Sequence, residues 1–289
     1  MSIIPEKQDS HKNNIVELIN KYNEFYIKNN FNINPTVWKH KNAIVNANVR
    51  FRGENAFLWQ EKMGDNKETY VKYYKIIKSI DKDNLLNKTF ECGSHGCRSY
   101  DFDNIKISRD LLDSILEIYF LKSFFSNLNE LSLLEIGGGY GRLCKRYLDC
   151  VPDSKYYVTD AIPQSTFFSK IYLNEKKTSV INLYDIQEKM KSLKIDIAVN
   201  IHSFPECNIN DVEWWVKFIN SNKIKYIFYV PNNPKSTPEF MPSNTEESIL
   251  NLFNKYNYTV KYFKNMFSEL NIECTVSSVP FFILENDKY

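Results

Sequence analysis

The feature that most constrains this chain is a run of glycines directly after a short apolar segment. Four of the eight glycines in the 289-residue chain lie within five positions, in the segment LLEIGGGYGRL at 133–143. The apolar residues predict a buried parallel strand, and the glycines predict a tight turn into a helix. Glycine lets the backbone approach a bound ligand closely because it has no Cβ. We therefore expect Gly137, Gly139 and Gly141 to lie in a cofactor site, with helix amides available to a polar ligand group.

Two acidic residues accompany this turn. The next apolar stretch, YYVTD, ends at Asp160, about 20 residues beyond the turn, where a βαβ nucleotide site places its ribose-binding carboxylate. Glu135 stands two positions before the first glycine, so the pattern E-x-G-x-G-x-G differs from the dinucleotide pattern G-x-G-x-x-G. We expect Glu135 either to face the cofactor or to accept hydrogen bonds from the amides of the turn.

Composition excludes several classes of function. Hydrophobic residues make up 43% of the chain and charged residues 25%, as in soluble globular proteins. The net charge of +2 is small and spread along the chain, so a phosphate-binding basic face, and with it a nucleic-acid partner, is not expected. No run approaches the ~18 apolar residues of a membrane span, and no signal peptide is recognisable. The sequence thus predicts a cytoplasmic protein whose six cysteines are free thiols.

Alternating strands and helices predict an α/β fold with a mostly parallel sheet wound on both faces. Strands are expected at 131–136, 156–160, 179–183, 195–201 and 225–230. A terminal antiparallel hairpin, 258–263 and 274–284, follows a helix with Ser243 and Glu246 at capping-box spacing. We divide the chain into a catalytic domain, 108–289, and an N-terminal extension, 1–107. The extension is expected to hold helices at 10–31 and 55–80 and a loop at 88–107, and Ser108 to cap the next helix.

Polar residues follow the fourth predicted strand. Asn200, His202, Ser203 and Glu206 come at its carboxyl end, the edge at which open parallel sheets bind ligands. An imidazole of near-neutral pKa can take a proton from a reacting hydroxyl, and so can a carboxylate in a dry site. His202 is therefore our first candidate for a catalytic base and Glu206 the second. In the alternative interpretation, both only hydrogen-bond within the loop.

The segment CGSHGCRSY at 92–100 allows three interpretations. Cys92, His95 and Cys97 have a spacing compatible with zinc, but the sequence offers no obvious fourth ligand. In the second interpretation, a glycine-permitted loop places His95, Arg98 and Tyr100 over the active site. The third is an ordered loop without a role in binding. We expect no metal site.

The glycine turn with Glu135 resembles motif I of the class I S-adenosylmethionine-dependent methyltransferases. Together with SRDLLDS at 108–114, DAIP at 160–163 and NIHSFPE at 200–206, it resembles the sugar O-methyltransferases encoded with bacterial surface-polysaccharide genes. The resemblance covers roughly residues 88–235. One departure is Ala161, where we would expect a leucine after the acid, and it mildly alters the adenine pocket.

This resemblance implies a Rossmann-like fold and S-adenosylmethionine as cofactor, with S-adenosylhomocysteine as product. The implied cofactor cleft is formed by Glu135, Gly137, Gly139 and Asp160. Further predicted cofactor contacts are Tyr140 and Ile162 as apolar walls, Asp185 at the adenine amino group, Gly141 and Asn200. Predicted acceptor contacts are His95, Arg98, Tyr100 and Ser203, with the extension covering the acceptor side.

The activity implied is methyl transfer to a sugar hydroxyl in capsule or O-antigen synthesis. The acceptor would be a sugar, a nucleotide sugar or a growing glycan. Two alternatives stay open at this point: methylation of a small metabolite or natural product, and a non-catalytic member that binds the cofactor only. The sequence does not define the oligomeric state.

Overall fold

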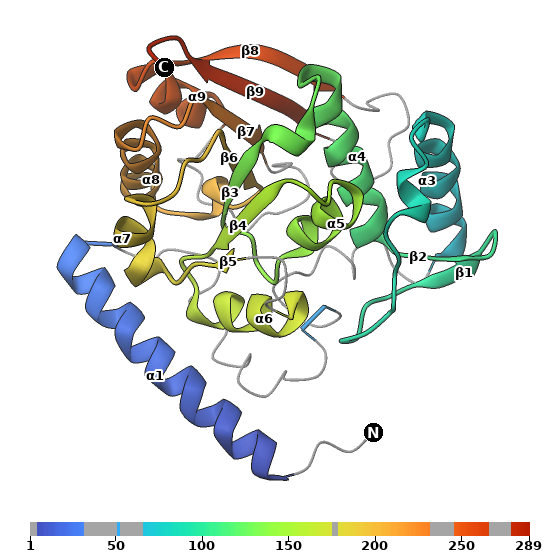
Figure 1. The fold of residues 1–289 in the computed structure, drawn as a ribbon, viewed down its shortest axis with the longest axis horizontal. Helices are drawn as coiled ribbons and strands as arrows, with labels where there is room; N and C mark the ends of the chain where they lie inside the picture. The colour runs from blue at the N-terminus through green and yellow to red at the C-terminus, as the bar shows by residue number, and fades with distance from the viewer. Residues whose placement is uncertain (1–4, 32–50, 53–65, 175–178, 232–245, 266–278) are drawn as a thin grey trace.

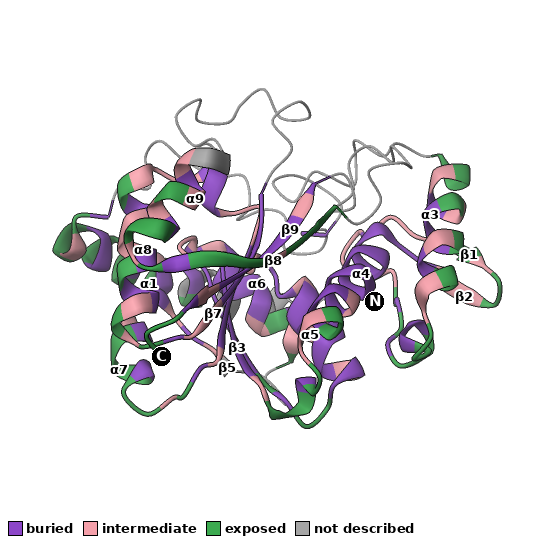
Figure 2. Ribbon diagram, turned by 90° about the horizontal axis from the view of Figure 1, so that it is seen from above, coloured by how far each residue is buried: buried purple, intermediate pink, exposed green. Residues whose placement is uncertain are grey.

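The computed structural model describes residues 5–31, 51–52, 66–174, 179–231, 246–265 and 279–289. In these ranges a seven-stranded sheet lies between two groups of helices (Figures 1 and 2). The strands of the sheet, in chain order, are β3 (Ser132–Ile136), β4 (Lys155–Thr159), β5 (Ser179–Val180), β6 (Ile197–Ile201), β7 (Tyr226–Val230), β8 (Tyr258–Asn265) and β9 (Pro280–Asn286).

The sheet has the spatial order β5-β4-β3-β6-β7-β9-β8. The first five strands in this order are parallel, with β3 in the centre between β4 and β6. β9 then runs antiparallel to both β7 and β8. The predicted α/β architecture with a mostly parallel sheet and an antiparallel carboxyl-terminal hairpin is therefore confirmed. Residues 274–278 of the predicted last strand lie outside the described ranges.

The helices cover both faces of the sheet because alternate strand residues point to opposite sides. Leu133 and Val199 pack with α3 (Lys67–Ile80), α4 (Arg109–Phe124) and α5 (Arg142–Cys150). Leu134 and Ala198 pack on the other face. The helices on that face are α1 (Pro5–Asn29), α6 (Pro163–Leu173), α7 (Ile186–Met190), α8 (Ile209–Ser221) and α9 (Glu246–Lys255). Figure 2 shows α8 and α9 on one side of the strands and α4 and α5 on the other.

The one predicted helix cap that lies in the described ranges, Ser108, is confirmed. The side chain of Ser108 accepts a hydrogen bond of 3.1 Å from the Leu111 amide and begins α4. α3 begins after Asn66, whose side chain accepts from the Glu68 amide, and residues 55–65 of this predicted helix lie outside the described ranges. The predicted cap Ser243 lies outside them as well.

One element was missed in the sequence. Residues 88–107 were expected to form a loop, but β1 (Tyr100–Phe102) and β2 (Ile105–Ile107) form an antiparallel hairpin there. Its two turn residues, Asp103 and Asn104, have φ of 52° and 63°. Such a turn with two left-handed residues suits the twist of a hairpin, and Asp and Asn tolerate it well.

Four short 3-10 turns complete the described elements, at Leu85–Asn87 (η3), Leu128–Glu130 (η4), Leu183–Asp185 (η5) and Phe204–Glu206 (η6).

The two helices described within residues 1–107 pack on opposite faces of the sheet. α3 lies against α4, whereas the long α1 lies against α6 and η5 (Figure 1). Buried residues of each helix belong to the same hydrophobic clusters as the strands. The boundary at residue 107 stays a prediction, but both helices share the core of the sheet. None of the helices in the described ranges combines the length and apolar character needed to cross a bilayer.

Candidate active site

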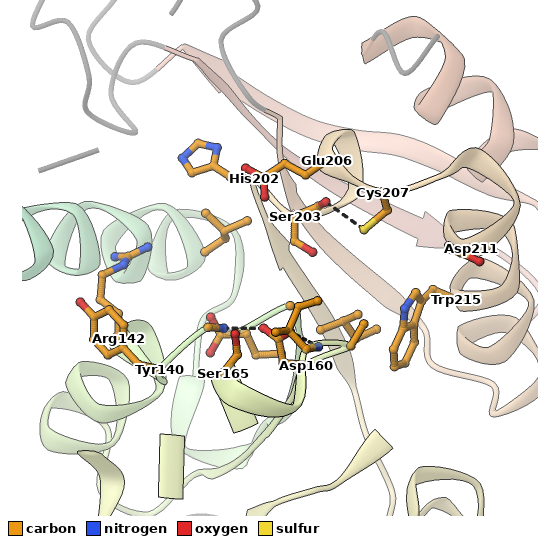
Figure 3. Close-up of a pocket in the computed structure, with 18 of the residues that line it drawn as sticks. Tyr140, Arg142, Asp160, Ser165, His202, Ser203, Glu206, Cys207, Asp211 and Trp215 are labelled. Atoms are coloured by element: carbon orange, nitrogen blue, oxygen red, sulfur yellow. Dashed lines mark hydrogen bonds between the residues drawn. The ribbon is translucent and has the colours of Figure 1, made fainter. Parts of the chain in front are cut away.

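A pocket opens at the carboxyl ends of β3, β4 and β6 (Figure 3). It encloses about 1170 Å³ of empty space, part of which is open solvent at its mouth. His202, Ser203 and Glu206 lie on one side of it, and Asp160 lies across from them (Figure 3). Residues lining the pocket are Phe31, Arg109, Asp110, Glu135–Tyr140, Arg142, Asp160–Ile162, Ser165, Ile201–Ser203, Glu206, Cys207, Asp211 and Trp215.

The glycine turn has the backbone conformation that its sequence predicts. Gly137, Gly139 and Gly141 have φ of 75°, 59° and 84°, in the left-handed region that favours glycine. The amides of Gly137 and Gly138 both donate to the carbonyl oxygen of Thr159. The turn is thereby fixed to the end of β4, and α5 begins immediately after Gly141.

Asp160 is held in place by backbone amides from two segments. Its Oδ2 accepts from the Gly139 amide at 2.9 Å, and its Oδ1 accepts from the Ile162 amide at 2.8 Å. Burial raises the pKa of this carboxyl to about 7, although the two amides favour its charged form. Asp160 therefore connects the glycine turn to the segment between β4 and α6, and it also lines the pocket.

Glu135 is a buried acid in the pocket wall. It sits on β3, lines the pocket, and its Oε2 has no hydrogen bond among the described residues. Burial raises the pKa of Glu135 to about 8, while nearby Arg142 opposes this shift. A buried, unsatisfied carboxyl oxygen is costly. Its position in the pocket wall makes it an acceptor for a donor group of a ligand.

Asn200 shapes the pocket from behind its wall. Its side-chain amide donates to the Ile136 carbonyl at 2.9 Å, and its Oδ1 accepts from the Phe204 amide at 3.1 Å. It is not among the pocket-lining residues. Asn200 therefore ties the end of β3 to the segment that carries His202, Ser203 and Glu206.

His202 is a neutral imidazole of defined tautomer. Its Nδ1 lies 2.9 Å from the carbonyl oxygen of Pro231, and because a carbonyl only accepts, Nδ1 carries the proton and Nε2 the lone pair. Burial, together with the charge of Arg109, lowers the pKa of His202 to about 3. The residue also has a left-handed φ of 62°. Both His202 and the second candidate base, Glu206, line the pocket.

Sequence reasoning assigned no role to two arginines that line the pocket. Arg109 pairs with Asp113 at 2.8 Å, and Arg142 makes a bidentate pair with Glu117 at 2.7 and 2.8 Å. The acids come from one buried face of α4. The segment SRDLLDS at 108–114 contains Arg109 and Asp113. The sequence does not show that this segment reaches the pocket, because only the packing of α4 brings it there.

A second buried charge network supports the same wall. Arg52 makes bonds of 3.0 and 2.8 Å to both carboxylate oxygens of Glu91 and also pairs with Asp110. The Tyr140 hydroxyl bonds the same oxygen of Asp110. Glu91 further pairs with Arg146 at 2.9 Å, and its charged partners hold the pKa of Glu91 at about 2 despite its burial. The predicted pocket wall Tyr140 is thus anchored by its hydroxyl.

Six predicted contacts are not among the pocket-lining residues: Gly141, Asn200, His95, Arg98, Tyr100 and Asp185. His95 stacks on Phe51 with ring centroids 4.4 Å apart, and Tyr100 packs against Tyr70. Arg98 lies between them in the sequence and is partly buried. Asp185, at the end of η5, accepts instead from the side-chain amide of Asn182 at 2.9 Å.

The cysteines and the zinc interpretation of residues 92–97 can also be compared with the structure. The cysteines of the described ranges, at positions 92, 97, 144, 150 and 207, form no disulfide with one another. No three His, Cys, Asp or Glu side chains in these ranges come together as a metal site requires. The zinc interpretation of Cys92, His95 and Cys97 therefore finds no support, and Cys92 instead lies 2.8 Å from the Ser94 hydroxyl.

The strand order, with β9 reversed beside β7, defines the Rossmann-like fold of class I methyltransferases. No protein-family model matches the sequence, and no curated protein matches it either. Several solved methyltransferase structures are similar to this chain. Human N-acetylserotonin methyltransferase in complex with SAM is 14% identical over 62% of this chain and 55% of that chain, with a TM-score of 0.41. The present chain thus spans about half of the human enzyme's length.

Two further similar structures come from bacteria. A SAM-dependent methyltransferase from Aquifex aeolicus is 13% identical over 74% of this chain and 98% of its own, with a TM-score of 0.41. Magnesium protoporphyrin IX methyltransferase from Synechocystis, solved with bound SAH, is 12% identical over 74% of this chain and 92% of its own, with a TM-score of 0.44.

Proposed function

We propose that this protein is an S-adenosylmethionine-dependent methyltransferase that methylates a sugar hydroxyl. The observation that carries the proposal is the glycine turn between two buried acids at the carboxyl edge of the sheet. Glu135 lies before the turn, and Asp160 faces it from the next strand. In this proposal both acids contact the nucleoside-type cofactor.

The residues present fit this cofactor. The unsatisfied Glu135 Oε2 can accept from the ammonium of its methionine part, and Arg109 or Arg142 can receive the carboxylate. Asp160 keeps lone pairs for the ribose hydroxyls besides its two amide bonds. The cofactor supplies an electrophilic methyl group on a sulfonium.

In this proposal His202 removes the proton of the acceptor hydroxyl. With Nδ1–H donated to the Pro231 carbonyl, Nε2 has the lone pair that a general base requires. Its low pKa keeps the ring neutral throughout the physiological pH range, and it also makes the imidazole a weaker base than the near-neutral histidine expected from the sequence. Glu206 on the same wall is the second candidate for this role. Synthesis of capsule or O-antigen would be the setting of such an enzyme, in the cytoplasm.

The pocket lining supports a hydroxyl-rich acceptor. Arg109, Asp110, Arg142, His202 and Ser203 present charged and polar groups, as recognition of a sugar requires. The aromatic lining residues Phe31, Tyr140 and Trp215 favour the second candidate, a small metabolite or natural product. Acceptor contacts from His95, Arg98 and Tyr100 stay a prediction, and so does a non-catalytic role in which only the cofactor binds.

Calorimetric binding of S-adenosylhomocysteine tests the cofactor. We expect the wild type to bind and Glu135→Gln, which keeps the shape but cannot ionise beside the ammonium of the ligand, to bind at least tenfold more weakly. Glu130→Gln, at the exposed end of η4, is the matched control and should bind like the wild type. Failure of the wild type to bind would refute the methyltransferase proposal. A sugar panel with labelled cofactor then tests the acceptor, and labelling of apolar metabolites alone would favour the second candidate.

A further inference from the structure

The first helix reaches the segment that carries Asp160. Tyr22 is fully buried on α1, and its hydroxyl lies 3.3 Å from the carbonyl oxygen of Asp160. The same hydroxyl lies 2.8 Å from the Thr166 hydroxyl on α6 and 3.0 Å from the Leu183 amide in η5. One phenol thus joins three segments that follow it by at least 138 residues.

The hydrogen-bonding capacities of these groups match completely. The Asp160 carbonyl can only accept, so the Tyr22 proton is donated to it. The Leu183 amide and the Thr166 hydroxyl then donate to the two lone pairs of the Tyr22 oxygen. Because every group is buried, losing the phenol oxygen would leave three of them without this partner.

A second tyrosine on α1 extends this contact. Tyr26, one helical turn after Tyr22, donates its hydroxyl to the carbonyl oxygen of Ala161. Phe31, just after the end of α1, then forms part of the pocket wall. α1 therefore holds the backbone of residues 160–161 from outside, while the Asp160 carboxylate holds the glycine turn from inside.

We propose that Tyr22 is a positioning residue for the cofactor site: it fixes the backbone of Asp160 and thereby the carboxylate that faces the pocket. The inference rests on the proposed function, since it assigns S-adenosylmethionine to this pocket. It gives α1 a role on the Asp160 side of the site. Tyr22 does not itself line the pocket, so its effect passes through Asp160.

The test compares two buried tyrosines that lose the same atom. In Tyr22→Phe we expect S-adenosylhomocysteine to bind about fivefold or more weakly, consistent with the loss of about one buried hydrogen bond. Tyr70→Phe is the control, because the buried Tyr70 hydroxyl has no hydrogen bond among the described residues. Its affinity should stay within about twofold of the wild type.

Thr166 gives an independent pair of variants if Tyr22→Phe does not fold. Thr166→Val removes the hydroxyl and should weaken binding, whereas Thr166→Ser keeps it and should restore wild-type affinity. Unfolding midpoints are measured in parallel, so that affinity is compared on folded protein. Wild-type affinity in Tyr22→Phe, or equal affinities of the Val and Ser variants, would overturn the positioning role alone. Absence of binding in the wild type would refute the proposed function and the inference with it.

Discussion

The Ser203 side chain occupies the space that any side chain at position 137 would need. An ideal Cβ on Gly137 would lie 2.0 Å from Ser203 Oγ and 2.4 Å from Ser203 Cβ. β3 and β6 are neighbouring parallel strands, and the segments that follow them therefore meet at this point. Glycine at 137 is required by this contact as well as by its φ of 75°.

Gly137→Ala should accordingly lower the free energy of unfolding by roughly 2–6 kcal/mol. This loss is the sum of two costs, the left-handed backbone conformation of an alanine and the steric overlap of its Cβ with Ser203. Urea denaturation measures this loss. The double variant Gly137→Ala with Ser203→Gly removes the clash but keeps the backbone strain, so it should recover part of the loss. A loss below about 0.5 kcal/mol in the single variant would contradict the contact.

Glu135 should make stability depend on pH. Its pKa is raised from 4.5 to about 8 in the folded protein, so the folded state holds this proton more tightly than the unfolded chain. The stability that results is complete below pH 4.5 and is lost as the pH rises towards 8, by at most about 1.4 kcal/mol per pH unit.

The variant Glu135→Gln lacks this proton equilibrium. Urea denaturation at pH 5, 6, 7 and 8 measures its free energy of unfolding beside that of the wild type. As the pH rises, the variant should become steadily more stable relative to the wild type. Glu130→Gln, at an exposed site, is the control in the same measurements. A constant difference for Glu135→Gln would show that this carboxyl is not desolvated.

The pH dependence of the rate should show no ionisation of His202 near the usual pKa of histidine. Because its pKa is lowered to about 3, the wild-type kcat/KM for methyl transfer should show no histidine limb between pH 5 and 8. An acid limb near pH 6.5 that disappears in a His202 variant would contradict this assignment.

Removal of the His202 imidazole should affect turnover and spare the cofactor. His202→Asn is the suitable variant, because asparagine tolerates the left-handed backbone. Its kcat should fall about 100-fold or more, with S-adenosylhomocysteine affinity within about twofold of wild type. If turnover were unchanged here and lost in Glu206→Gln, the proton acceptor would be Glu206.

The Arg52 network should contribute strongly to stability. Arg52→Met leaves Glu91 and Asp110 buried beside a neutral side chain and should cost about 3–5 kcal/mol. Lys106→Met breaks the exposed pair with Asp101 and should cost less than about 1 kcal/mol. Urea denaturation of both variants makes the comparison, and similar losses would contradict a role for burial.

Local sequence patterns were sufficient for the centre of the site. Gly137, Asp160 and His202 follow apolar strands at recognisable spacing, and parallel strands bring their carboxyl ends to one edge. For that reason the sheet and its reversed last strand were predictable without coordinates, together with nine of the 21 residues that line the pocket.

The other residues of the site depend on packing between segments that are far apart in the sequence. Arg109 and Asp110 open a helix whose inner face carries buried acids, and ordinary periodicity assigns such a charged face to solvent. Phe31 reaches the pocket only because α1 packs on α6. His95, in contrast, stacks on Phe51. This contact could not be predicted from a local sequence pattern, because the two residues are far apart in the chain.

The bond between Tyr22 and Asp160 also has a consequence for biosynthesis. Ribosomes make α1 before its partners, which emerge at least 138 residues later. The apolar side of α1, including Ile15, Leu18 and Phe25, therefore has no sheet to cover during most of translation. Contacts so distant in sequence form late in folding, and the nascent chain must be kept from associating through this helix until α6 and η5 exist.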